Sequence, residues 1–381
     1  MGAAFLMATS AIGPGFILQT TKFTEKLAAS FGFVILISTL LDIGAQLNIW
    51  RIISVSKLYA QDFANTVFNG AGLLLTVLIV VGGIAFNIGN IAGCGLAMQV
   101  LFGLNVKAGA AISCIIAVTI FLVKEAGVAM DRFAKLLGGI MIGLTVYVAI
   151  QSHPPVREAV IKSFIPDVID ETIILTIVGG TVGGYISFAG VHRLLDAGIS
   201  GVENLRSVSA SSITAIVIAA TMRIVLFLAV LGTVSHGIKL DPHNPAATVF
   251  QSAAGVIGYK LFGIVLWSAA ITSVVGSAFT SVSFIKTASP FILKNLRYFI
   301  IGFILFSTVI FLCVGQPVKV LIFAGGLNGL ILPVALSLIL IGSYKKTIIR
   351  NYSHPYWMQV AGWIVVVVMT YMAAKGIINL F

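Results

Sequence analysis

Long apolar runs separated by short polar segments dominate the chain. About eleven of these runs are long enough to cross a bilayer as a helix. The strands of a membrane barrel would alternate apolar and polar positions, and these runs do not alternate. The pattern therefore predicts an all-α integral membrane protein. The expected spans are 2–21, 28–56, 70–102, 106–123, 132–150, 171–196, 209–235, 247–284, 298–314, 318–343 and 357–380.

Composition and charge support this interpretation. Hydrophobic residues make up 59% of the 381 positions and charged residues 9%, whereas about a quarter of a soluble domain is charged. The net charge of +11 would suggest nucleic-acid binding in a soluble protein. Here the basic residues lie at the ends of apolar runs, with roughly 13 in the loops expected inside and roughly 8 outside. This bias predicts a multi-pass protein of the plasma membrane with its N-terminus in the cytoplasm.

Two of the runs carry a glycine-rich interruption near their centre. The first, "SAIGPGFILQ" (10–19), contains Gly13, Pro14 and Gly15. The second, "VGGTVGGYISF" (178–188), contains two glycine pairs. These pairs are Gly179 with Gly180, and Gly183 with Gly184.

The two interruptions occupy corresponding positions if spans one to five and six to ten form two halves. Five spans in each half give the halves opposite topology, so we expect inverted repeats at approximately 1–150 and 165–343. An extra helix at 357–380 completes a single transmembrane domain, 1–381. This arrangement is typical of secondary transporters whose site lies at the bilayer midplane. The alternative is that glycine and proline merely kink two tightly packed helices.

An unwound stretch also has chemical consequences. Its free backbone groups are costly in hydrocarbon unless they line a cavity and meet a ligand. The N-termini of the following half-helices favour an anion, whereas freed carbonyl groups favour a cation.

Several short motifs make the chain similar to a known family. The segment around Gly13 aligns with a Asp-Pro-Gly-Asn motif, and "ASFGF" (29–33), "LFG" (101–103) and "LPVAL" (332–336) follow in the expected order. The sequence thereby resembles the Nramp metal-transporter family over nearly its whole length. The resemblance implies a LeuT-type fold with two inverted five-helix repeats and broken helices one and six.

The metal ligands of that family do not carry over. The resemblance aligns the family's metal-binding Asp with Gly13, its Asn with Phe16 and its Met with Gly183. A further Gln aligns with Gly325. A divalent cation needs oxygen, nitrogen or sulfur donors, so we expect no metal site and no cofactor.

The proton route of the family also changes. Its acidic residues on the third helix align with Asn87 and Asn90, and its sixth-helix His aligns with Gly190. Asparagine cannot titrate, and His192 lies on another helical face. Asn87 and Asn90 share a face, where they would bind a substrate or a hydrated ion, or hydrogen-bond between helices.

Without acids, the interrupted region is suited to a small organic anion held by backbone N–H groups. The chain also resembles a bacterial Nramp-like branch associated with the use of 5-oxoproline, which implies a small ring carboxylate as substrate. A rebuilt site for Mn²⁺, Fe²⁺ or Mg²⁺ is the alternative. The expected substrate-binding residues are Gly13, Pro14, Gly15, Phe16, Gln19, Asn87, Asn90, Thr181, Gly183, Gly184, Tyr185 and Ser187.

A polar patch in the eighth span is a candidate site for the coupling ion. Thr272, Ser273 and Ser277 lie in "ITSVVGSAFTS", and hydroxyls at this place in LeuT-type carriers help to hold sodium. Adjacent serines also occur here in the Nramp family, so coupling to Na⁺ or H⁺ stays open. These hydroxyls would otherwise bond the carbonyl four residues earlier.

Three ionisable residues, Asp42, Arg223 and Lys260, fall inside expected spans, where charges usually have a function. Arg223 would contact substrate, act in gating or pair with Asp42, and Lys260 would extend to the interface. No catalytic motif is present, so we expect a transporter and not an enzyme. The expected partners are a small carboxylate, a coupling cation and the lipid bilayer, without nucleic acid or an obligate protein partner.

Overall fold

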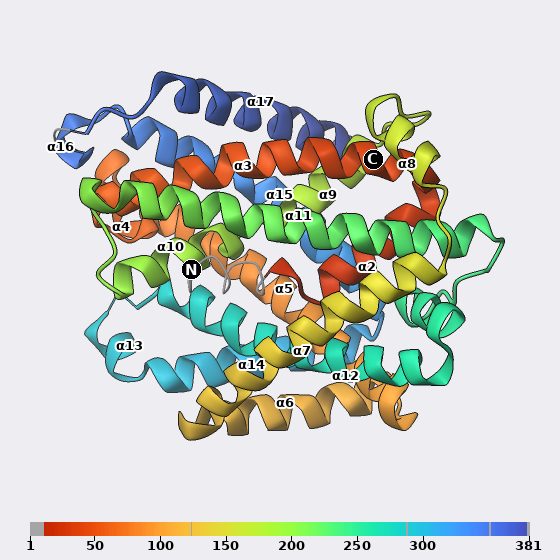
Figure 1. Cartoon of the computed structure of the whole chain (residues 1–381). Helices are drawn as coiled ribbons and strands as arrows, with labels where there is room; N and C mark the ends of the chain where they lie inside the picture. Colours follow the sequence, from red (N-terminus) through yellow and green to blue (C-terminus); the bar gives the residue numbers. More distant parts are fainter. Residues whose placement is uncertain (1–10, 123, 287–288, 350–351, 379–381) are drawn as a thin grey trace.

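The structure is a computed structural model that describes residues 11–122, 124–286, 289–349 and 352–378. The described residues form helices and no strand, as the apolar pattern predicts (Figure 1). The beginning of the expected first span, 2–10, lies outside the described residues.

The first half of the chain contains α2 to α8. Their bounds are α2 Pro14–Leu27, α3 Phe31–Ser56, α4 Ala60–Val67, α5 Ala71–Phe102, α6 Val106–Leu122, α7 Lys124–Gln151 and α8 Val156–Phe164. The second half contains α9 to α17. Their bounds are α9 Glu171–Thr181, α10 Tyr185–Asp196, α11 Leu205–Ser235, α12 Pro245–Ser283, α13 Pro290–Lys294, α14 Leu296–Val314, α15 Pro317–Gly342, α16 Lys346–Ile349 and α17 Tyr356–Ile378.

Eight helical runs in the described chain are long and apolar enough to cross a membrane, and a bent pair, α7 with α8, makes a ninth. One run, Pro14–Ser56, contains both α2 and α3. The helix α6 is apolar but has only 17 residues. Counting α2 and α3 separately and including α6 accounts for the expected eleven spans.

The helices pack in pairs that repeat between the two halves. The helices α3 and α11, each the first long helix after an interrupted span, lie side by side across the bundle (Figure 1). The next helices, α5 and α12, also pack together. The helices α6 and α17 lie on opposite outer sides. The boundaries 1–150 and 165–343 stay a prediction.

Two local features differ from a simple helix–loop pattern. The segment expected as a loop between the fifth and sixth spans contains α8, which bends away from α7 by 105°. The long helix α12 is kinked at Gly255, whose φ of 60° lies in the left-handed region that glycine tolerates. Beyond the kink, the Lys260 ammonium donates to the carbonyls of Val100 and Leu101 at 2.7 Å each. Lys260 therefore caps the end of α5.

Candidate functional site

The first interruption lies immediately before α2. Ile12 and Gly13 are not helical, and Gly13 has the extended angles φ −103° and ψ −172°. Pro14 follows at the first helical position, where its missing N–H and fixed φ cost nothing. Pro14 therefore begins α2 directly after these two non-helical residues.

The second interruption separates α9 from α10. The break covers Val182 to Gly184, and Gly184 has a φ of 53°, a conformation that favours glycine. The Ser187 hydroxyl donates to the Val182 carbonyl at 2.5 Å and so satisfies one freed backbone group. The run Glu171–Asp196 that contains this break has its most apolar stretch wholly buried in the bundle.

Side chains from two other helices face the first break. A Cβ atom on Gly13 would lie 3.3 Å from the Ser273 hydroxyl and 3.6 Å from Oδ1 of Asn90. The Ser273 hydroxyl and Nδ2 of Asn90 are buried, and neither has a hydrogen-bond partner among the described residues. Because buried polar groups are nearly always paired, this polar cluster of α2, α5 and α12 is incomplete.

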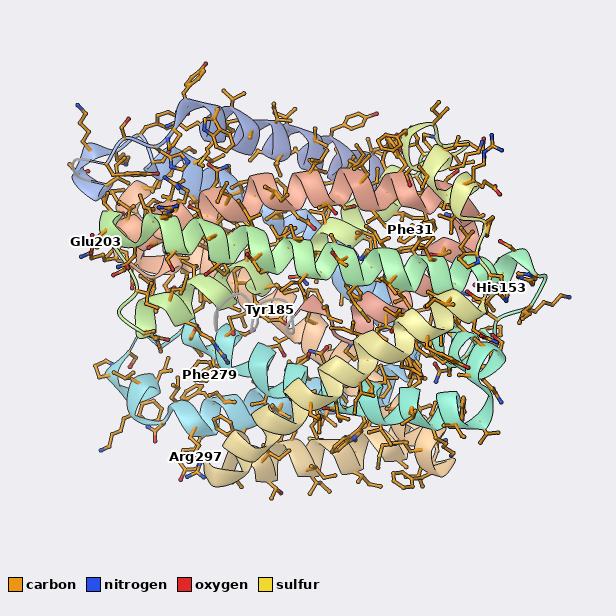
Figure 2. The ribbon with its side chains drawn as sticks, viewed as in Figure 1. Phe31, His153, Tyr185, Glu203, Phe279 and Arg297 are labelled. Carbon is orange, nitrogen blue, oxygen red and sulfur yellow. The ribbon has the colours of Figure 1, made fainter. Side chains whose placement is uncertain are left out.

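Tyr185 connects this cluster to the second break. Its hydroxyl lies near the side chains of Asn90 and Ser277 but forms no hydrogen bond with Nδ2 of Asn90, and its ring meets Phe86 edge-on at 5.3 Å. The Ser277 hydroxyl donates to Oδ1 of Asn87 at 3.0 Å. Figure 2 shows Tyr185 near the middle of the bundle, between the ends marked by Glu203 and His153. The predicted residues Asn87, Asn90, Tyr185, Ser273 and Ser277 thus form one group.

A buried arginine on α11 contacts both breaks. The Arg223 guanidinium carbon lies 4.3 Å from the centre of the Phe16 ring, one turn into α2. Its Nη1 donates to the hydroxyl of Thr181, the last residue of α9, at 3.0 Å. Asp42 on α3 interacts with it electrostatically, yet no direct ion pair joins these two described side chains. The sequence singled out Arg223 as an intramembrane cation but did not place it at the breaks.

Other predicted site residues serve mainly in packing. The Gln19 amide donates to the Leu321 carbonyl at 2.8 Å and packs against Gly325 on α15. A Cβ atom at Gly183 would overlap with the Gly179 carbonyl. The Thr272 hydroxyl bonds the Ser268 carbonyl four residues earlier, as the sequence alternative anticipates. Their roles in binding substrate or ion stay predictions.

The donors around Gly13 are amide and hydroxyl groups. Within the described residues, no group of three or more His, Cys, Asp or Glu side chains is arranged to hold a metal ion. The set lacks the carboxylate and thioether donors that transition-metal sites use. Neutral donors of this kind fit a polar organic molecule or a weakly bound monovalent ion.

A second polar cluster lies where α10 ends. The Tyr59 hydroxyl donates to Asp196, and Lys286 contacts both, at 3.0 Å from the hydroxyl and 3.4 Å from the carboxylate. Burial and the Asp196 hydrogen bond raise the pKa of Tyr59 above its usual value of 10.0. The hydroxyl therefore remains a donor, and it ties the segment before α4 to the end of α10 and to the segment that follows α12.

Sequence comparison establishes the class of this transporter-like fold. The model of the natural resistance-associated macrophage protein-like family, Nramp, matches residues 4–379. The chain belongs to the Nramp family.

Two relatives of similar length share more than half of its residues. The uncharacterized membrane protein YcsG of Bacillus subtilis is 59% identical over 372 residues, covering 98% of this chain and 92% of that protein. An uncharacterized membrane protein of Haemophilus influenzae is 58% identical over 379 residues, covering 100% of this chain and 96% of that protein. Both relatives are bacterial membrane proteins.

Solved structures share the fold at low identity. A manganese transporter of Eremococcus coleocola is 15% identical, with a TM-score of 0.74 over 98% of this chain and 84% of that one. MhsT, in complex with L-phenylalanine, is 16% identical, with a TM-score of 0.65 over 98% of each chain. Mhp1, with bromovinylhydantoin bound, is 15% identical, with a TM-score of 0.57 over 98% of this chain and 92% of that one. The fold is of the LeuT type, as the motifs predict.

Proposed function

We propose that the protein is a secondary transporter that carries a small organic anion of the 5-oxoproline type across the bacterial plasma membrane, coupled to Na⁺ or H⁺. The observation that carries this proposal is the donor set at the first break. Asn90 and Ser273 supply buried neutral donors beside Gly13, at the position where a metal carrier of this family has an acid.

The fold is compatible with organic substrates as well as metals. Among proteins that share it, one is a manganese transporter, whereas MhsT holds L-phenylalanine and Mhp1 holds a hydantoin. A hydantoin is a five-membered ring amide, as is 5-oxoproline. Function has to be argued from the site because the fold is common to both groups.

The contacts at one end of the bundle support the proposed orientation. Arg51 donates to Ser209, Lys57 pairs with Glu203, and Lys286 pairs with Asp196. Arg51 lies in the last turns of α3, Lys57 directly after α3 and Lys286 just beyond α12, at the end of the bundle that the charge bias assigns to the cytoplasm. This agrees with an N-terminus in the cytoplasm.

The first two helices of each repeat would move as a unit in alternating access. In the first repeat these are α2 and α3. In the second they are the interrupted helix α9–α10 and α11. The two pairs are joined because α3 packs directly on α11. The site residues Asn90 and Ser273 belong instead to α5 and α12, which pack together as a second unit. A substrate bound between the two units would therefore sense their relative movement.

Uptake into proteoliposomes tests the proposal. Purified protein is reconstituted, and radiolabelled 5-oxoproline and Mn²⁺ are supplied separately under an inward Na⁺ gradient, an inward proton gradient, or none. We expect 5-oxoproline to accumulate under one of the two gradients, and Mn²⁺ entry to equal that of protein-free vesicles.

The result also separates the alternatives. Saturable Mn²⁺ uptake without 5-oxoproline uptake would overturn the organic-anion assignment in favour of a rebuilt metal site. Uptake of neither solute, in vesicles where thermal unfolding shows folded protein, would also count against this substrate class. Competition by unlabelled carboxylates then ranks related substrates.

A further inference from the structure

The most unusual charged group in the described bundle is the guanidinium of Arg223. The side chain is 3% exposed, and its Nε and Nη2 have no hydrogen-bond partner in the part of the chain that the structure describes. A cation within a membrane span normally pairs with an anion or a carbonyl group. We propose that Arg223 binds the carboxylate of the transported anion between the two helix breaks, an inference that rests on the proposed function.

The contacts already made by Arg223 fix the orientation of its guanidinium. The Phe16 ring covers one face at 4.3 Å, and the Thr181 hydroxyl accepts from Nη1 at 3.0 Å. Phe16 follows the first break by one turn, and Thr181 directly precedes the second. The guanidinium is therefore held by residues from both interrupted helices.

The two free nitrogen atoms have the geometry that a carboxylate needs. Nε and Nη2 lie on the same edge of the guanidinium, and their N–H bonds are parallel. Two parallel donors match the two oxygens of a carboxylate in a bidentate pair. Arg223 thus presents an unused carboxylate-binding edge.

The nearest acidic residue does not complete this edge. Asp42 is 2% exposed, and its Oδ1 also lacks a hydrogen-bond partner among the described residues. It acts on Arg223 electrostatically without direct contact. Asp42 lowers the cost of burying the cation and leaves its donors available to a ligand.

A buried positive charge also determines which solutes are excluded. A divalent cation between the breaks would be repelled by Arg223, whereas an anion would be attracted. The same residue therefore favours a carboxylate and disfavours the metal ions of the wider family.

Calorimetry with two matched ligands tests this assignment. The ligands are 5-oxoproline and its primary amide, which differ in the charge of one group, titrated into purified protein in detergent. We expect the wild type to bind the acid at least about tenfold more tightly than the amide, since a charged pair is stronger than a neutral one. In Arg223→Gln the binding affinity for the acid should fall about 30-fold or more, and the affinity for the amide should fall less than about threefold.

Two further variants control the comparison. Arg223→Lys keeps the charge but loses the bidentate edge, so the binding affinity for the acid should fall about tenfold. Arg206→Gln removes an exposed arginine from the same helix and should change neither affinity. If Arg223→Gln does not fold, the double variant with Asp42→Asn removes both buried charges, and the ratio of acid to amide affinity is measured there.

The outcomes separate the two levels of inference. A wild type that prefers the acid, with the preference retained in Arg223→Gln, overturns the role of Arg223 and leaves carboxylate transport intact. A wild type that binds neither ligand, or both equally, overturns the proposed function and this inference together. Loss of the preference only in the Arg223 variants supports both.

Discussion

The two helix breaks have the same origin in sequence but differ in their surroundings. A Cβ atom on Gly13 would make a tight contact with the Ser273 hydroxyl at 3.3 Å and would lie 3.6 Å from Oδ1 of Asn90. A Cβ atom on Gly184, by contrast, would overlap with the Asn328 amide oxygen on α15. Each break faces at least one buried polar atom that has no hydrogen-bond partner among the described residues, Nδ2 of Asn90 and the Ser273 hydroxyl at the first and Oδ1 of Asn328 at the second. Only the second break is packed so closely that an added Cβ atom would overlap with its neighbour.

This difference assigns different tasks to similar glycine-rich segments. Glycine at the second break permits a close approach of α9 and α15 and a left-handed backbone at Gly184. Glycine at the first break lets the donors Asn90 and Ser273 lie close to the backbone. We infer that the first break contributes the larger part of the ligand contacts.

A polar network near the C-terminal end of α3 is an example of a completed set of hydrogen bonds. Arg51 donates to the Tyr352 hydroxyl at 3.2 Å, and this hydroxyl lies 3.0 Å from Nδ1 of His354. Nε2 of His354 lies 2.7 Å from Oδ1 of Asn48, whose amide donates to the Met358 carbonyl. The groups at Gly13 lack such closure, as we expect of a ligand site and not of a structural network.

The largest effect is expected from adding a methyl group at each break. Gly184→Ala should lower the free energy of unfolding by about 3 kcal/mol, because it combines overlap with Asn328 and backbone strain. Gly13→Ala should cost less than about 1 kcal/mol, since its Cβ makes only a tight contact. Thermal unfolding in detergent measures both.

A third glycine separates strain from overlap. Gly198 has a φ of 74° and no atom within 4 Å of an added Cβ, so Gly198→Ala reports the backbone term alone. Equal losses at Gly13 and Gly184 would contradict the proposed contrast between the breaks.

The next effect comes from a negative charge at the first break. Gly13→Asp would place a carboxylate beside Ser273 and Asn90, and its repulsion of an anionic substrate should weaken 5-oxoproline binding about tenfold or more. Calorimetry on Gly13→Asp and the neutral, isosteric Gly13→Asn isolates the charge. Equal affinities in these two variants would show that the anion does not bind near Gly13.

Removing one unpartnered donor should have a smaller effect. Ser273→Ala deletes a hydroxyl that has no partner among the described residues, so binding should weaken about three- to tenfold, the value of one hydrogen bond, with stability unchanged. Ser307→Ala is the matched control, because its buried hydroxyl bonds the Phe303 carbonyl on α14. If Ser273→Ala loses stability and retains affinity, its role is structural.

The last effect is a pH dependence expected at the completed network. Burial, and then the charge of Arg51, lower the pKa of His354 from 6.5 to about 4. The unfolded chain therefore binds the proton first as the pH falls below 6.5, so stability is lost between pH 6.5 and about 4. Thermal unfolding of wild type and His354→Gln at pH 7 and pH 4.5 measures this loss. An equal loss in the variant, which cannot titrate there, would assign it to other groups.

Much of the fold followed from the sequence because it depends on local composition. A bilayer requires helices of a given length, so the apolar runs predicted the spans, and Gly-Pro at 13–14 and the glycines before Tyr185 predicted both breaks. Short helices such as α8 were not expected, because their few residues carry a weak pattern. The motifs that resemble the Nramp family predicted the fold correctly.

The content of the site was decided by tertiary structure. The sequence named Asn90, Ser273 and Tyr185, but only the packing of α5, α10 and α12 brings them together. The sequence marked Arg223 as an intramembrane charge without indicating its neighbours. Its position over Phe16 and beside Thr181 depends on how α11 crosses two interrupted helices, because contacts between residues far apart in the chain are set by side-chain packing and not by local pattern.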